Sequence, residues 1–86
     1  MPNIKSAKKR VLIAHMRRQR NAMAKSRMKT QLKKFSAAIA TGDKQIAANE
    51  LRTSVSILDK TAAKGVIHKN AASRRKAKLY RVYNGL

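Results

Sequence analysis

Few side chains in this sequence could carry out acid–base, nucleophilic or metal chemistry. The chain has no cysteine, and its other candidates are three carboxylates and two histidines, Asp43, Glu50, Asp59, His15 and His68. Glu50 and Asp59 are nine residues apart, which is about 180° around a helix, so they cannot act together as an acid–base pair or enclose a hard cation. Both histidines lie among basic residues, without an acidic partner to orient the ring. The sequence therefore predicts no enzyme and neither a metal nor a cofactor site.

Positive charge is the chemistry that the sequence does provide. Lys and Arg number 22 against three Asp and Glu, for a formal net charge of +19 over 86 residues. Residues 1–40 carry twelve of these cations and no carboxylate, residues 41–63 balance three against three, and residues 64–86 carry seven. A solvated surface normally mixes both signs, so this acid-free run indicates an anionic partner. Nucleic acid is the first candidate, because neutralising several phosphates releases counterions.

Lysine and arginine are expected to contribute differently to such an interface. A Lys ammonium is an interchangeable point charge, whereas the planar fork of Arg can grip a phosphate with two hydrogen bonds or stack on a base. The specific contacts are therefore expected at Arg10, Arg17, Arg18, Arg74 and Arg75. The predicted nucleic-acid-facing set also includes Lys5, Lys8, Lys9, Arg20, Lys25, Arg27, Lys29, Lys33, Lys34, Lys76 and Lys78, and both histidines are expected to be solvated or to face RNA.

Aromatic side chains, which read single-stranded bases by stacking, are scarce. The chain has one Phe and two Tyr, and Phe35 belongs to the predicted core. Tyr80 and Tyr83 could stack on bases or pack against a neighbouring helix. We therefore expect recognition of shape and backbone in folded, double-helical RNA.

The spacing of apolar residues predicts three helices, over residues 6–40, 44–64 and 67–83. The buried stripe of the first is expected to consist of Met28, Leu32, Phe35 and Ile39. The stripe of the second is expected to consist of Ala47, Leu51, Ser54, Val55, Leu58 and Ala62. The third has a weaker face, interrupted by Arg75, that consists of Ala71, Ala72, Leu79 and Val82.

Capping signals separate these helices into an antiparallel bundle. Ser6 is the expected N-cap of the first helix, with Asn3 as the alternative. Gly42 and Gly65 can take the left-handed conformation that ends a helix, and Asp43 can cap the second helix. The sequence thus predicts an all-α fold, a three-helix bundle with a long, basic first helix that overhangs it.

The overhang follows from two independent observations. Continuing the first helix's apolar sector toward the N-terminus meets mainly basic residues, so the core should stop near Ala24. The second helix, folded back, also reaches only to about residue 21. We therefore expect one domain with a basic arm, residues 1–20, and a bundle, residues 21–86. The helical part of the arm has about 15 residues without packing, and we expect it to be largely disordered until RNA binds.

Four short stretches then resemble the bacterial ribosomal protein S-twenty family over nearly the whole chain. These are NIKSAKKR at residues 3–10, GDK at 42–44, LDK at 58–60 and AKGVIHKN at 63–70. The resemblance implies a three-helix protein that binds small-subunit ribosomal RNA directly and early in assembly, holds RNA helices together, and needs neither self-association nor extensive protein contacts. The RNA-contacting residues that it implies are Asn3, Lys5, Ser6, Lys8, Lys9, Arg10, Lys64, His68, Lys69, Asn70 and Arg74.

Two other interpretations remain open from the sequence. A nucleoid or histone-like DNA-binding protein would suit the charge equally well. A cationic membrane-active helix would need a broad apolar face with Trp or Phe, and Val11, Leu12 and Met16 are predicted to be too scattered to form one. The apolar runs are also too short for a signal peptide or a membrane span, so a cytoplasmic, ribosomal location is expected and a plastid origin stays possible.

Overall fold

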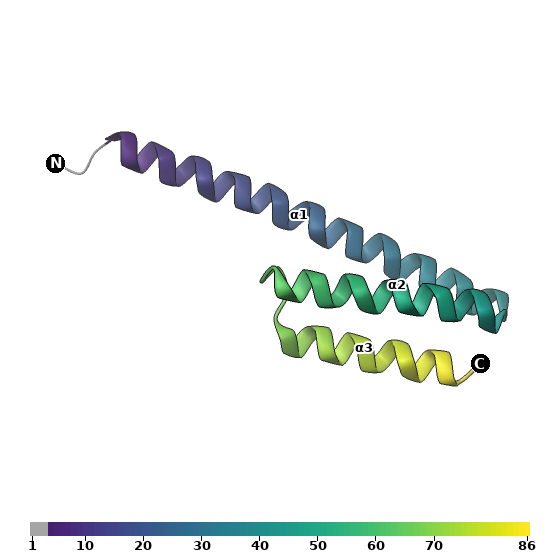
Figure 1. Ribbon diagram of the computed structural model, residues 1–86. Helices are drawn as coiled ribbons and strands as arrows, with labels where there is room; N and C mark the ends of the chain where they lie inside the picture. The colour runs from purple at the N-terminus through teal and green to yellow at the C-terminus, as the bar shows by residue number, and fades with distance from the viewer. Residues whose placement is uncertain (1–3) are drawn as a thin grey trace.

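The computed structural model describes residues 4–86, which form three α-helices, α1 (Ile4–Thr41), α2 (Lys44–Ala63) and α3 (Lys69–Asn84). In Figure 1, α2 lies between α1 and α3, and the purple N-terminal half of α1 extends past the other two helices. The molecule measures 63 × 21 × 13 Å, with a radius of gyration of 17.6 Å. A compact chain of this length would have a radius of about 12 Å. The all-α bundle is confirmed, and α1 accounts for the elongated shape.

The turn between α1 and α2 forms as its residue types predict. Gly42 has φ +74°, a conformation that costs a residue with a Cβ about 1–2 kcal/mol. Asp43 then caps α2, because its Oδ1 accepts hydrogen bonds from the backbone N–H of Gln45 (2.9 Å) and Ile46 (3.3 Å). Both expected roles are confirmed.

The N-cap prediction at Ser6 is wrong. Helix α1 already includes Ile4 and Lys5, whose side chains are compatible with a helix, so Ser6 lies within the first turns. The alternative cap, Asn3, lies outside the described residues.

The turn from α2 to α3 begins where predicted, but it ends later than predicted. Gly65 has φ +76° and follows the end of α2 as expected. However, α3 begins at Lys69, two residues later than predicted, because His68 is its N-cap. The Nδ1 atom of His68 accepts a hydrogen bond from the backbone N–H of Asn70 (3.1 Å). Ile67 remains in the turn, where its partly buried side chain packs against the core.

The core lies along the two faces of α2. Its buried cluster combines Met28, Phe35, Leu51, Leu58 and Leu79 from the three helices. The predicted stripes of α1 and α2 are thereby confirmed, with Leu32, Ile39 and Val55 packed at the edges. On α3 the expected Val82 is 40% exposed and Tyr83 packs against the core instead. Tyr83 is four residues from Leu79 and so shares its face, whereas Val82 falls on the flank.

Polar side chains also lie in the α1–α2 seam. The Nε2 atom of Gln31 donates to Glu50 Oε2 (2.6 Å) and to Ser54 Oγ (3.3 Å), and both Gln31 and Ser54 are buried. The buried Thr61 hydroxyl donates to the carbonyl of Ile57 (2.6 Å). Leaving a buried donor unpaired would cost about 1–3 kcal/mol, so the two Gln31 bonds, which cross the seam, favour one pairing of the helices, whereas the Thr61 bond stays within α2.

Candidate nucleic-acid interface

The two halves of α1 differ in exposure, because only the second half has a buried face. Every residue from 4 to 23 is exposed, Ala24 is half-buried and Met28 is the first buried residue. The core thus stops where the sequence predicts. Within residues 4–20, seven Lys and Arg side chains project from the helix with no carboxylate among them.

The structure exposes nearly all of the predicted contact residues. Asn3 lies outside the described residues, and Lys76 is only half-buried. The exposed members are Lys5, Ser6, Lys8, Lys9, Arg10, Arg17, Arg18, Arg20, Lys25, Arg27, Lys29, Lys33, Lys34, Lys64, His68, Lys69, Asn70, Arg74, Arg75 and Lys78.

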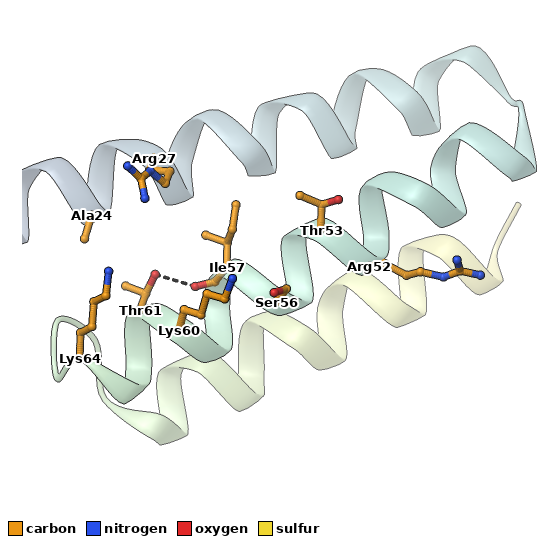
Figure 2. A pocket seen from close by; sticks show the side chains of 9 residues that line it. All are labelled: Ala24, Arg27, Arg52, Thr53, Ser56, Ile57, Lys60, Thr61 and Lys64. Atoms are coloured by element: carbon orange, nitrogen blue, oxygen red, sulfur yellow. Dashed lines mark hydrogen bonds between the residues drawn. The ribbon is translucent and has the colours of Figure 1, made fainter.

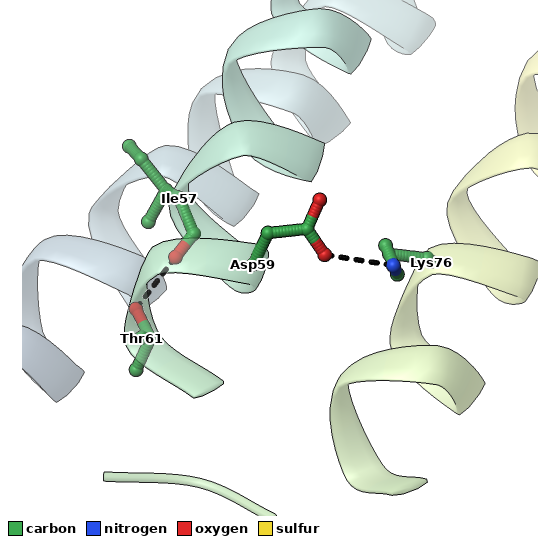
Figure 3. Close-up of polar contacts among 4 residues, drawn as sticks. All are labelled: Ile57, Asp59, Thr61 and Lys76. Atoms are coloured by element: carbon green, nitrogen blue, oxygen red, sulfur yellow. Dashed lines mark hydrogen bonds and ion pairs between the residues drawn. The ribbon is translucent and has the colours of Figure 1, made fainter. Parts of the chain in front are cut away.

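The three carboxylates are all engaged within the protein. Asp43 caps α2, and Glu50 faces α1, where it accepts the hydrogen bond from Gln31. Asp59 faces α3 and forms an ion pair with Lys76, with 2.7 Å between Oδ1 and Nζ (Figure 3). The half-turn separation that the sequence indicates for Glu50 and Asp59 thus directs them to different helices. Each acidic group thus has a partner within the bundle, and none lies on the arm.

Lys76 has a structural partner that the sequence analysis did not assign. Its ammonium bridges α3 to α2 through Asp59, so an RNA phosphate would have to compete with that carboxylate. Lys44 makes a second link between the same helices, because its Nζ lies 5.8 Å from the centre of the Tyr83 ring. Lys44 at the start of α2 thus meets Tyr83 near the end of α3, and Asp59 late in α2 meets Lys76 in the middle of α3, as two antiparallel helices require.

The start of α3 brings a second group of predicted contacts together. As the N-cap, His68 uses Nδ1 on the backbone, which leaves the opposite edge of its exposed ring facing outward. Lys69 and Asn70 follow in the first turn of α3. A helix N-terminus favours anions, because its backbone N–H groups carry partial positive charge. The local backbone therefore adds to the side-chain charge here.

The C-terminal end of the arm and the α2–α3 turn face each other across a hollow. Arg17, Arg20 and Lys64 line one hollow together with Asn21 and Val66. The second helix was expected to reach back along the first helix as far as residue 21. The turn that follows α2 reaches farther, because it lines a hollow together with Arg17. The cations between Lys5 and Arg10 lie farther out along α1.

An apolar strip on the arm was missed by the sequence analysis. Ile4, Ala7, Val11, Leu12 and His15 line one shallow depression, which Lys8 also flanks. Val11 and Leu12 are thus less scattered than predicted, although Met16 is not part of the strip. The signal was present as the spacing 4, 7, 11 and 15, which follows one helix face. No helix in residues 4–86 has the length and hydropathy needed to cross a bilayer.

Fold and surface together define the class of this protein. It is a small all-α protein with an elongated cationic surface, suited to contact a polyanion. Within residues 4–86, no three His, Asp or Glu side chains are placed to hold a metal ion.

The chain belongs to the ribosomal protein S20 family, whose model matches residues 2–84. It is 52% identical over 84 residues to the small ribosomal subunit protein bS20 of Heliobacterium modesticaldum, covering 98% of this chain and 96% of that protein. It is 50% and 49% identical over 86 residues to proteins of the same name from Serratia proteamaculans and Vibrio cholerae, with both chains of each pair fully covered. The S-twenty resemblance is thereby confirmed. The family consists of ribosomal structural proteins, so the prediction that this chain is not an enzyme is confirmed as well.

Proposed function

We propose that this protein binds small-subunit ribosomal RNA directly and braces separate RNA helices during and after assembly of the subunit. The names of its relatives place those proteins in the small ribosomal subunit. The proposal adds a direct contact with RNA and a mechanical role. It also implies a cytoplasmic location on the ribosome, with few protein contacts and no self-association.

The observation that carries the proposal is the unpacked half of α1. A helical segment from residue 4 to 23 is exposed on every side and contains no carboxylate. Mutual repulsion of its cations disfavours this segment in the absence of a counter-surface. Phosphates on both sides of the arm would remove that repulsion and release counterions.

Bracing requires a second contact that is fixed relative to the first. The beginning of α3 provides one, with His68, Lys69 and Asn70 exposed on the turn that α2 anchors. If one RNA helix bound the arm and another bound this turn, the cations of the protein would lower the repulsion between the two RNA helices. The rigid bundle would also fix their relative placement. The protein would then act by position and charge, without a chemical step.

The test is a binding experiment at about 0.2 M salt, where non-specific contacts are weak. Labelled small-subunit RNA and a DNA duplex of equal phosphate content are each titrated, with unlabelled duplex DNA as competitor. We expect the RNA complex to survive the competitor and the DNA complex to dissociate. Equal displacement of both would favour the DNA-binding alternative and contradict the proposal.

Hydroxyl-radical footprinting tests the bracing role separately. The proposal expects protection of at least two RNA segments that are distant in RNA sequence. Charge-reversed variants of the arm, such as Lys8→Glu with Lys9→Glu, should remove one set of protections and retain the other. A single protected segment, lost as a whole in that variant, would contradict bracing while leaving RNA binding in place.

A further inference from the structure

Two adjoining hollows run along the seam between α1 and α2. The first, of about 510 Å³, is lined by residues of both helices, including Arg27, Arg52, Lys60 and Lys64. The second, of about 530 Å³, includes Arg17, Arg20 and Lys64. Because they share Ala24 and Lys64, they form one continuous depression, which we name the seam trough.

The seam trough is lined by cations alone among its charged groups. Six Lys or Arg side chains line it, and no Asp or Glu does. Two of the six, Arg52 and Lys60, lie on α2, which has no net charge together with its N-cap Asp43. Its acidic groups are used elsewhere, since Glu50 bonds to Gln31 and Asp59 pairs with Lys76. The neutral total therefore conceals a strongly basic face.

Figure 2 shows how these side chains are arranged. Lys64 extends from the end of α2 toward α1, Lys60 runs along α2 beside Ile57, and Arg27 lies across the hollow on α1. Arg52 lies at the other end of the hollow, where its guanidinium points away from Lys60 and Arg27. The hydroxyls of Thr53 and Thr61 donate to backbone carbonyls of their own helix. Charge is thus the property that the trough offers to a ligand.

The length of the seam trough argues for a chain of phosphates over a single one. From residue 52 to residue 64 along α2 the rise is about 18 Å, and Arg17 extends the cations beyond that end. Small ligands are usually enclosed by convergent groups, whereas here the cations succeed one another along an open groove. A row of charges matches a polymer with a charge on every residue.

Resting on the proposed function, we infer that the seam trough binds the phosphodiester backbone of an RNA strand, with Arg52 and Lys60 as contact residues. This strand would lie against the bundle, separate from the RNA around the tip of the arm. The bundle then holds RNA through α2 as well as through the start of α3.

The first test measures the salt dependence of RNA binding for Arg52→Ala and Lys60→Ala. Each lost phosphate contact should reduce the slope of log K against log salt by about 0.7–0.9. Arg81→Ala is the matched control, because Arg81 is an exposed α3 arginine that lines neither hollow. The expected result is a reduced slope for both trough variants and an unchanged slope for the control. Equal reductions in all three, or in none, would overturn the inference.

The second test locates the RNA directly and does not depend on affinity. The protein has no cysteine, so Ser56→Cys, which lies in the trough, gives a unique attachment point for an iron chelate that cleaves nearby RNA. We expect strand scission in the complex, at nucleotides other than those cut from a chelate at Ser6→Cys. Absence of cleavage from position 56 would overturn the inference. If the wild-type protein does not bind the RNA at all, the proposed function itself fails, whereas binding without cleavage from position 56 rejects only the trough.

Discussion

The two halves of α1 are one continuous helix in two different environments. Residues 4–23 are exposed, whereas the half that follows buries Met28 and Phe35 against α2. Helix formation is limited by its nucleus, and adding further residues is less costly. The packed half can therefore supply the nucleus from which the exposed half extends. The bundle can thus start the helix, but the exposed half has no packed face of its own, so we expect it to be stably helical only when RNA covers it.

The largest contrast should appear in amide hydrogen exchange of the free protein. Amides in the packed half of α1 and in α2 are expected to open only by global unfolding, which for 86 residues costs roughly 4 kcal/mol or more. Amides of residues 4–20 lack tertiary contacts and should exchange with almost no protection. Comparable protection in both halves would contradict the view that the arm is ordered only when RNA is present.

Two leucine substitutions sharpen the comparison energetically. Leu58 has no exposed surface and lies at the centre of the core, whereas Leu12 is 58% exposed on the arm. Leu58→Ala should lower the free energy of unfolding by about 2–5 kcal/mol. Leu12→Ala should change it by less than about 0.5 kcal/mol. Urea denaturation followed by circular dichroism measures both, and similar losses would show that the arm is packed after all.

When RNA binding is measured in place of stability, substitutions on the arm should have the larger effect. Replacing Lys8, Lys9 and Arg10 together by Ala is expected to reduce the slope of log K against log salt by about 2–3, since each contact contributes about 0.7–0.9. The melting temperature should not fall, because repulsion is relieved. A control that exchanges Lys for Arg and Arg for Lys at these positions preserves the charge and should preserve the slope. A lower melting temperature with an unchanged slope would assign the arm a structural role.

A smaller effect is expected at the turn that folds α2 back on α1. Asp43→Ala removes the cap of α2 and should lower the free energy of unfolding by about 1 kcal/mol. Asp43→Asn is the matched control, because Asn caps helices about as well without the charge. If both variants lose equal stability, the charge of Asp43 matters and the capping hydrogen bonds do not. The urea midpoint distinguishes the two cases.

The smallest effect is expected at the ion pair between α2 and α3. The side chains of Lys76 and Asp59 are 31% and 54% exposed, and such pairs contribute about 0.2–1 kcal/mol. A double-mutant cycle with Asp59→Asn and Lys76→Gln should give a coupling in that range that vanishes at 1 M salt. A larger, salt-independent coupling would mean that this contact helps to define the bundle.

Local rules predicted much of this architecture. Stripes at three- and four-residue spacing located the buried faces of α1 and α2, and Gly42, Asp43 and Gly65 marked the turns between helices. The start of α3 was misplaced because histidine is not among the usual N-capping residues, although His68 serves as one here. Short-range patterns thus succeed where the residue types follow common preferences.

Features that depend on distant partners could not be predicted in the same way. Gln31 is buried because Glu50 and Ser54, about 20 positions along the chain, satisfy its amide. The seam trough escaped notice for a related reason, since a net charge of zero does not reveal that the acidic side chains of α2 point elsewhere. The pairing of helices had to be known before either feature could be recognised.

The uninterrupted course of α1 has one more consequence. Residues 4–41 contain neither Gly nor Pro, the usual causes of kinks. The orientation of the N-terminal tip of α1 about the helix axis is therefore fixed relative to the bundle. Each added residue would turn the tip by about 100° and advance it by about 1.5 Å. A one-residue insertion after Ala22 would therefore keep every charge and yet rotate the cations of the arm relative to the bundle. The two surfaces could then no longer contact their partners at the same time.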